Sequence, residues 1–181
     1  MGLEELCLGP FCIDSCPRVS LISSFSQQSV LSAIASAIEN ASRIVTVASF
    51  VITLTRSSPA AARIRSALVG AARRGVDVLV MLDGVRENAK RYNCGTARIL
   101  GRRGVNVWLS RGRSLHMKVY AADSLVIIGS VNVSSQESLE AAVAISSRDI
   151  AHAVHTMIRD LKERYGGTWE SICINKEQAY Q

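Results

Sequence analysis

Residues 115–140 read LHMKVYAADSLVIIGSVNVSSQESLE and carry the clearest signals of fold and chemistry in the chain. Segments 114–121 and 125–130 are short and mostly apolar, and Asp123-Ser124 between them is typical of a tight turn. We therefore expect two antiparallel strands joined as a hairpin. Alternate residues of a strand share a face, so His116, Lys118 and Tyr120 are predicted to point to the same side.

The second strand is predicted to place Val126, Ile128, Ser130 and Asn132 on one face. Antiparallel pairing can then bring His116 and Lys118 close to Ser130 and Asn132. A histidine can attack phosphorus, and the other three side chains can bind phosphate oxygens. The alternative is an ordinary strand with a solvated polar face, because His-x-Lys alone is common. Polar groups in Gly-Ser-Val-Asn (129–132) interrupt an otherwise apolar strand, which favours a functional site.

This combination resembles the motif of the phospholipase D superfamily, His-x-Lys-x4-Asp followed by Gly-Ser-x-Asn. The matching residues are His116, Lys118, Asp123 and the stretch 129–132, and an apolar strand beginning at Glu140 is also similar. The resemblance covers about residues 19–169, and the layout is similar to that of bacterial single-motif endonucleases. One departure is the spacer 124–128, which has five residues where the family usually has six. The turn can absorb this deletion.

Outward from the motif, helices and strands alternate. Strands are predicted at 19–23, 44–51, 77–83 and 105–110, with helices at 27–40, 58–74 and 96–103 between them and a polar loop at 84–95. This order predicts a parallel sheet with helices on its faces. A further strand at 140–146 and a helix at 149–165 follow.

Together with the resemblance, these elements predict an α/β fold. It is a phospholipase D-like α-β-α sandwich with a mixed, largely parallel sheet and one HKD motif per chain. We expect three segments: a Cys-containing extension at 1–17, a catalytic domain at 18–170 and a tail at 171–181.

Composition favours a single globular domain, with 48% hydrophobic residues among 181. The net charge of +6 fits an anionic partner but equally a basic surface without a partner. No apolar run is long enough to span a membrane, and no signal peptide precedes the first element. We therefore expect a soluble cytoplasmic protein.

The five cysteines leave their state open among a metal site, disulfides and free thiols. Their odd number means that at least one is free or pairs between chains, and the N-terminal spacing is not a common zinc spacing. The cysteines are Cys7, Cys12, Cys16, Cys94 and Cys173. His152 and His155 are predicted to be exposed residues of the last helix rather than a metal pair.

The resemblance implies a mechanism in which two copies of the motif share one active site, so a single-motif chain is expected to form a homodimer. One His116 attacks phosphorus and the other protonates the leaving oxygen. Lys118 and Asn132 are expected to hold the non-bridging oxygens, Ser130 to support them, and Glu140 to accept the second ring N–H of His116. Asp123, also part of the motif, is expected to be structural, and no metal or other cofactor is needed.

The substrate class is the least determined part of this prediction. A nuclease acting on DNA or RNA is favoured, with Arg111 and Arg113 contacting flanking phosphates unless they are plain loop charges. A phospholipase D or phosphatidyltransferase that acts on lipid uses the same chemistry. A catalytically silent nucleic-acid-binding module is the third alternative.

Overall fold

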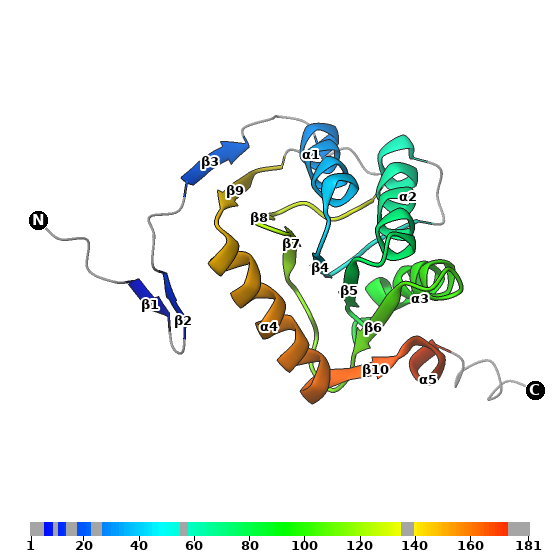
Figure 1. The fold of residues 1–181 in the computed structure, drawn as a ribbon. Helices are drawn as coiled ribbons and strands as arrows, with labels where there is room; N and C mark the ends of the chain where they lie inside the picture. Colours follow the sequence, from blue (N-terminus) through cyan, green and yellow to red (C-terminus); the bar gives the residue numbers. More distant parts are fainter. Residues whose placement is uncertain are drawn as a thin grey trace, which may run out of the picture.

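The computed structural model describes residues 6–8, 11–13, 18–22, 27–54, 58–134 and 140–173. An eight-stranded sheet lies at its centre, with strand order β10-β6-β5-β4-β7-β8-β9-β3 (Figure 1). A two-stranded sheet stands apart from it, formed by β1 (Leu6–Leu8) and β2 (Phe11–Ile13) within the predicted extension.

The central sheet and its helices follow in chain order. They are β3 (Arg18–Ile22), α1 (Gln27–Asn40), β4 (Ile44–Ser49), α2 (Pro59–Arg73), β5 (Asp77–Leu82), α3 (Glu87–Gly101), β6 (Asn106–Ser110), β7 (Lys118–Ala122), β8 (Leu125–Gly129), β9 (Ala142–Ser146), α4 (Arg148–Tyr165), β10 (Gly166–Thr168) and α5 (Trp169–Cys173).

The sheet is mixed, as predicted, but its parallel part is smaller than the sequence indicated. Parallel pairing joins β4 to β5 and β5 to β6, and the other neighbours pair antiparallel. The first predicted strand, β3, does not join the parallel group but pairs with β9 at the far edge. Helix–strand alternation indicates the order of elements, whereas the choice of partner depends on which strand edges remain open after the chain has folded.

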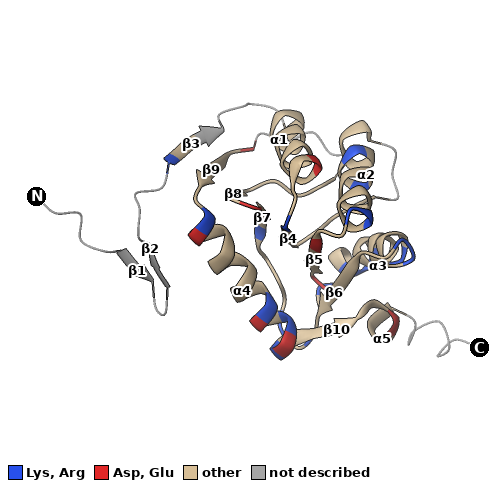
Figure 2. Ribbon diagram, viewed as in Figure 1, with Lys and Arg blue, Asp and Glu red and all other residues tan. Residues whose placement is uncertain are grey.

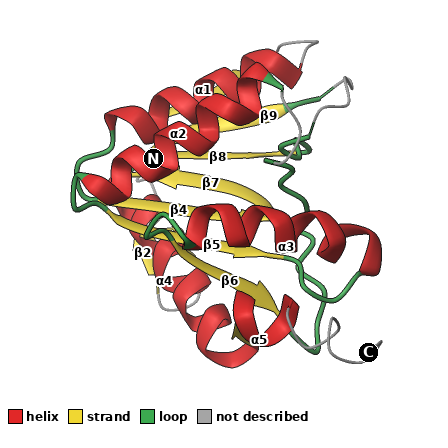
Figure 3. Cartoon of the chain, turned by 90° about the vertical axis from the view of Figure 1, so that its right-hand side faces the viewer, coloured by secondary structure: helices red, strands yellow, loops and turns green. Residues whose placement is uncertain are grey.

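Helices cover both faces of the sheet, so the α/β sandwich is confirmed. α1, α2 and α3 lie on one face and α4 lies on the other (Figure 3). Alternation along β4 follows these two layers: Val45 and Val47 belong to the main core under α1–α3, whereas Ala48 packs in the cluster with Ile158 of α4. No helix in the described ranges combines the length and apolar character that a membrane span requires.

The structure corrects the predicted loop at 84–95, because α3 begins at Glu87. The buried side of α3 includes Asn93 and Thr96, both fully buried. The Asn93 amide accepts a hydrogen bond from Ile52 N at 3.0 Å and donates to Phe50 O at 2.8 Å, and Thr96 Oγ1 accepts one from Leu54 N at 3.2 Å. These polar side chains form hydrogen bonds with the backbone N–H and C=O groups of the segment that follows β4. A search for apolar periodicity misses such a helix, because the residues that it buries are polar.

His155 was predicted to be exposed, and this was wrong. Its side chain is buried between α4 and the sheet, where Nδ1 lies 2.7 Å from Thr46 Oγ1 and Nε2 lies 3.6 Å from Asp77 Oδ2. Burial lowers the pKa of His155, although the charge of Asp77 opposes this effect. His152 is exposed, as predicted. The helix is rotated slightly from the predicted stripe and turns His155 inward.

A disulfide joins Cys94 of α3 to Cys173 of α5, with a Cα–Cα distance of 5.7 Å and a sequence separation of 79 residues. Cys173 lies beyond the predicted domain boundary at residue 170, so the bond ties part of the predicted tail to α3. Cys7 and Cys12 occupy paired backbone positions in β1 and β2, and Cys16 lies outside the described residues.

We expect removal of this disulfide to destabilise the fold. Cys94→Ala should lower the free energy of unfolding by about 2–4 kcal/mol, because the bond restricts a long loop in the unfolded chain. Urea denaturation of the oxidised protein measures this change. Cys173→Ala should have the same effect, and a reductant should not destabilise either variant further by a similar amount. Equal stability of wild type and Cys94→Ala would show that the bond does not contribute.

Candidate active site

His116 lies in a short segment that precedes β7, not in the strand itself, which was predicted to begin at residue 114. The backbone is fixed on both sides of the residue. Leu115 N donates to Asp83 Oδ1 at 2.6 Å, and Met117 O accepts from Phe50 N at 2.9 Å. The His116 side chain is exposed and meets the Phe50 ring edge-on, with 4.7 Å between the ring centroids. An anchored backbone therefore presents an exposed imidazole at the carboxyl end of β4 and β5.

Asp83, which the sequence interpretation did not assign to the site, holds this segment. It is fully buried just past the end of β5. Besides Leu115 N, its carboxylate accepts hydrogen bonds from Arg86 N at 2.8 Å and Ser110 Oγ at 3.3 Å. An acidic residue directly after a buried strand was the available signal, because such a charge requires several donors.

We expect Asp83→Ala to impair both stability and activity. Three donors lose their acceptor, and at about 1 kcal/mol or more per buried donor the free energy of unfolding should fall by roughly 3 kcal/mol. Displacement of His116 should lower kcat/KM roughly tenfold or more in the protein that remains folded. Asp83→Asn keeps an oxygen acceptor and should lose less. Full activity of a folded Asp83→Ala variant would show that the carboxylate does not position His116.

Lys118 follows on the same side of the chain. Its Nζ lies 5.6 Å from the centroid of the Phe50 ring, so Phe50 contacts both the imidazole and the ammonium. Partial burial lowers the pKa of Lys118, and the negative charge of Glu140 opposes this effect. No sequence pattern pointed to Phe50, because its apolar segment was predicted to continue as a strand to residue 51.

Ser130 and Glu140 are brought together where β8 ends and β9 begins. Ser130 Oγ donates a short hydrogen bond to Glu140 Oε2 and accepts one from Ala141 N at 3.2 Å. Gly129 permits this approach, since a Cβ there would collide with Ala141 O. Glu140 thus contacts Ser130 and acts electrostatically on Lys118. Its predicted bond to His116 stays a prediction.

The predicted face of the second strand was wrong, although Ser130 still reaches the site. Val126 packs with Val119 under α4, on the face opposite Tyr120. β8 ends at Gly129, so strand alternation does not extend to Ser130 and Asn132. The chain leaves the sheet there, and contacts from other elements fix its path.

Asn132 lies in a loop with three successive carbonyls that each accept a hydrogen bond. Tyr120 Oη donates to Val131 O at 2.9 Å, Gln27 Nε2 to Asn132 O at 2.8 Å, and Thr53 N to Val133 O at 2.7 Å. Burial raises the pKa of Tyr120 to about 12, so its hydroxyl remains a donor at neutral pH.

The Asn132 side chain is the polar group that this loop presents. Its Oδ1 is buried and makes no hydrogen bond within the described part of the chain. Buried polar atoms are nearly always paired, so an unpaired amide end is suited to a ligand. If the amide turns by 180°, it offers an N–H donor at the same position.

Asp123, the remaining motif residue, lies at the other end of β7 from His116. It adopts a positive φ of 50° in the turn after the strand. Its carboxylate accepts hydrogen bonds from the backbone N–H groups of Ser42, Arg43 and Ile44 at 2.9–3.0 Å, and from the Ser42 hydroxyl. Burial raises the pKa of Asp123, but these bonds together outweigh burial and lower it. The geometry supports the structural role that was expected: Asp123 fixes the start of β4.

Arg111 and Arg113 are exposed in the loop that leads from β6 to His116. Arg111 N donates to Tyr165 O at 2.7 Å, and the Arg113 guanidinium carbon lies 5.7 Å from the centroid of the Tyr165 ring. Elsewhere basic residues lie on α2 and α3, while both ends of α4 carry basic and acidic residues together (Figure 2). The two arginines therefore add positive charge at the edge of the sheet that holds His116.

Comparison with known proteins identifies the class. The sequence matches the family described as "Cardiolipin synthase, PLD-like domain" over residues 34–162, which is well over half of the chain. The protein therefore belongs to this phospholipase D-like family, as the motif predicted. A comparison with curated protein sequences gave no match.

Solved structures support the same fold. Nuc from Salmonella typhimurium, described as a phospholipase D family member, is 24% identical, with a TM-score of 0.65 over 82% of this chain and 96% of its own. NucT from Helicobacter pylori is 20% identical, with a TM-score of 0.62 over 83% and 99%. Phosphatidylserine synthase from Haemophilus influenzae is 14% identical, with a TM-score of 0.66 over 84% of this chain and 38% of its own.

Proposed function

We propose that this protein is a phosphodiesterase, specifically a metal-independent endonuclease that works as a homodimer. The observation that carries the proposal is the exposed His116 imidazole on a rigid segment beside Lys118, in a phospholipase D-like chain with one copy of the motif. An exposed imidazole suits a site that a second subunit completes. The dimer then supplies two His116 side chains to one phosphodiester.

In the first step, an imidazole nitrogen of one His116 forms a bond to phosphorus while the bond from phosphorus to the leaving oxygen breaks. The partner's His116 donates a proton to that oxygen. In the second step, the same imidazole takes a proton from water, and the water oxygen displaces the first His116 from phosphorus. One ring must therefore begin neutral and the other protonated, a state that a histidine pair can adopt near neutral pH.

The remaining site residues have supporting roles in this proposal. Lys118 and the amide of Asn132 bind the non-bridging oxygens and offset the negative charge of the transition state. Ser130 joins Glu140 to the site through its hydroxyl. Glu140 favours the charged form of Lys118, and we expect it to orient His116 in the assembled dimer.

A nucleic-acid substrate is supported by the net charge of +6 and by Arg111 and Arg113 beside the site. The same phosphoryl chemistry serves a lipid-directed phospholipase D or phosphatidyltransferase. The matching family is described as a cardiolipin synthase family, and one similar structure is a phosphatidylserine synthase. A lipid substrate is therefore tested as the second candidate. The third, a silent binding module, is less well supported because each position of the motif is filled.

The test is cleavage of labelled single- and double-stranded DNA and RNA in excess EDTA, with phosphatidylglycerol vesicles assayed in parallel. The proposal expects nucleic-acid cleavage that persists in EDTA. Cleavage of the vesicles alone would assign a lipid substrate. Salt-sensitive binding without turnover on any substrate would assign a binding module.

A further inference from the structure

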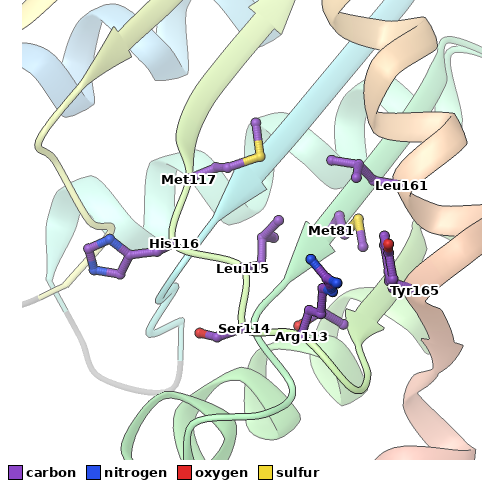
Figure 4. A pocket seen from close by; sticks show the side chains of 9 residues that line it. Met81, Arg113, Ser114, Leu115, His116, Met117, Leu161 and Tyr165 are labelled. Carbon is purple, nitrogen blue, oxygen red and sulfur yellow. The ribbon is translucent and has the colours of Figure 1, made fainter.

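A cavity of about 370 Å³ opens at the same edge of the sheet as His116 (Figure 4). This volume is in the range of roughly 300–1,000 Å³ that is common for small-molecule sites. The lining residues come from β5, from the end of β6, from the segment before β7 and from the last turns of α4. They include Met81, Leu115, Met117, Leu161, Tyr165 and Arg113.

His116 is among the residues that line the cavity, but its ring lies on the other side of the backbone from Leu115 and Met117 (Figure 4). In Figure 4 Leu115 and Met117 lie toward the cavity, whereas the His116 ring points away from it. The ring instead contacts Phe50. Residues 114–117 thus form a wall that is one extended chain thick. A ligand that uses both sides must carry a phosphate and a second group separated by only a few bonds.

The lining specifies the nature of that second group. Most of the cavity wall consists of aliphatic and thioether side chains, and the half-buried ring of Tyr165 closes one side of the cavity. Thioether sulfur and aromatic rings both contact flat π-systems favourably. Arg113 and Ser114 are exposed and offer polar donors to the edge of a ligand or to a neighbouring phosphate.

We propose that this cavity binds one unpaired nucleobase from a nucleotide next to the scissile phosphate, and that Tyr165 is the residue that stacks on it. This inference rests on the proposed nuclease function and assigns it a single-stranded substrate. A nucleotide carries a phosphate and a flat base with apolar faces, joined through one sugar, so a phosphate held at His116 leaves the base within a few bonds of the cavity. In a duplex the base is stacked and paired, so its entry requires flipping out of the helix, which costs free energy.

Backbone hydrogen bonds hold Tyr165 in place, as a residue that stacks on a base requires. Tyr165 O accepts from Arg111 N at 2.7 Å, and the next residue, Gly166, pairs with Ser110 in the sheet. The ring is therefore positioned relative to the segment that carries His116. An acyl chain is the less suitable occupant, because it needs a longer apolar channel and has no use for the guanidinium of Arg113.

The experiment places a single abasic residue at successive positions of a labelled single-stranded oligonucleotide and measures kcat/KM in EDTA. For the wild type we expect a loss of roughly 5- to 100-fold when the abasic residue is next to the cleaved phosphate, and little loss elsewhere. Tyr165→Ala should lose a similar factor on the intact strand. On the strand that is abasic at the sensitive position, Tyr165→Ala should cleave as fast as the wild type.

Controls separate stacking from damage to the fold. Tyr165→Phe keeps the ring and should retain the preference for a base, while Met157→Ala, an exposed change elsewhere on α4, should behave as wild type. Equal losses for Tyr165→Ala on intact and abasic strands would overturn the proposal. If Tyr165→Ala cleaves phosphatidylglycerol vesicles more slowly than the wild type but cleaves nucleic acid equally fast, the cavity holds an acyl group. That result would also overturn the proposal.

The experiment distinguishes a missing nuclease activity from a missing base site. If the wild type cleaves no nucleic acid at all, the nuclease function fails and the base site fails with it. If His116-dependent cleavage occurs but is insensitive to the abasic position, the nuclease function stands and the base site alone is wrong.

Discussion

His116→Asn is expected to lower kcat/KM for phosphodiester cleavage by roughly 1,000-fold or more. Asparagine cannot form the phosphorus–nitrogen intermediate or transfer the proton, so the proposed mechanism loses its nucleophile and its acid at once. The imidazole is exposed and makes its ring contact with Phe50, so the fold should tolerate the change. Cleavage assays together with thermal unfolding measure both effects. A folded His116→Asn variant that retains near-normal turnover would refute a histidine nucleophile.

The same variant tests whether two subunits share one active site, as proposed. Mixtures of wild type and His116→Asn, allowed to exchange subunits, contain homodimers and heterodimers in binomial proportions. Because one site needs both His116 side chains, the heterodimer should be inactive, and activity should fall as the square of the wild-type fraction. A linear fall would show that each subunit acts alone.

Lys118→Met is expected to lower kcat roughly 100- to 1,000-fold, the usual cost of removing one charge-stabilising donor from a transition state. The ammonium lies over the Phe50 ring, which also contacts His116, and is close enough to Glu140 to be affected by its charge. Lys90→Met removes the same charge from α3 and serves as the matched control, with an expected change of a few-fold. If the two substitutions lowered kcat equally, Lys118 would contribute only to the overall positive charge and not to the transition state.

The pH dependence of substrate binding tests independently whether the Lys118 ammonium contacts the substrate. In the His116→Asn variant, which we expect to bind substrate without cleaving it, the contribution of Lys118 to binding is present below the pKa of the ammonium and is lost as pH rises through it. Because burial lowers this pKa, the loss should occur below the ordinary lysine value of about 10.4. Glu140→Gln removes an opposing charge and should move the loss to still lower pH. A profile unchanged by both Lys118→Met and Glu140→Gln would contradict the assignment.

Two features of the fold show where sequence interpretation reached its limit. Helix α3 was missed along its first turns because Asn93 and Thr96 fill its buried side and satisfy the backbone of residues 50–54. His155 was predicted to be exposed, yet it bonds Thr46 under α4. In both cases a polar residue is buried because it forms a hydrogen bond there, and its hydrogen-bond partner lies far away along the chain.

The local sequence alone determined the family and the α/β class, and it singled out the candidate site residues. His116, Lys118, Ser130 and Asn132 are recognisable because polar groups interrupt short apolar strands at fixed spacing, and spacing is a property of the chain itself. The tertiary structure alone decided what holds them. Asp83 anchors the segment of His116, Gln27 and Tyr120 fix the loop of Asn132, and Phe50 contacts both His116 and Lys118. These contacts join residues 11 to 105 positions apart, so no periodicity in the sequence encodes them.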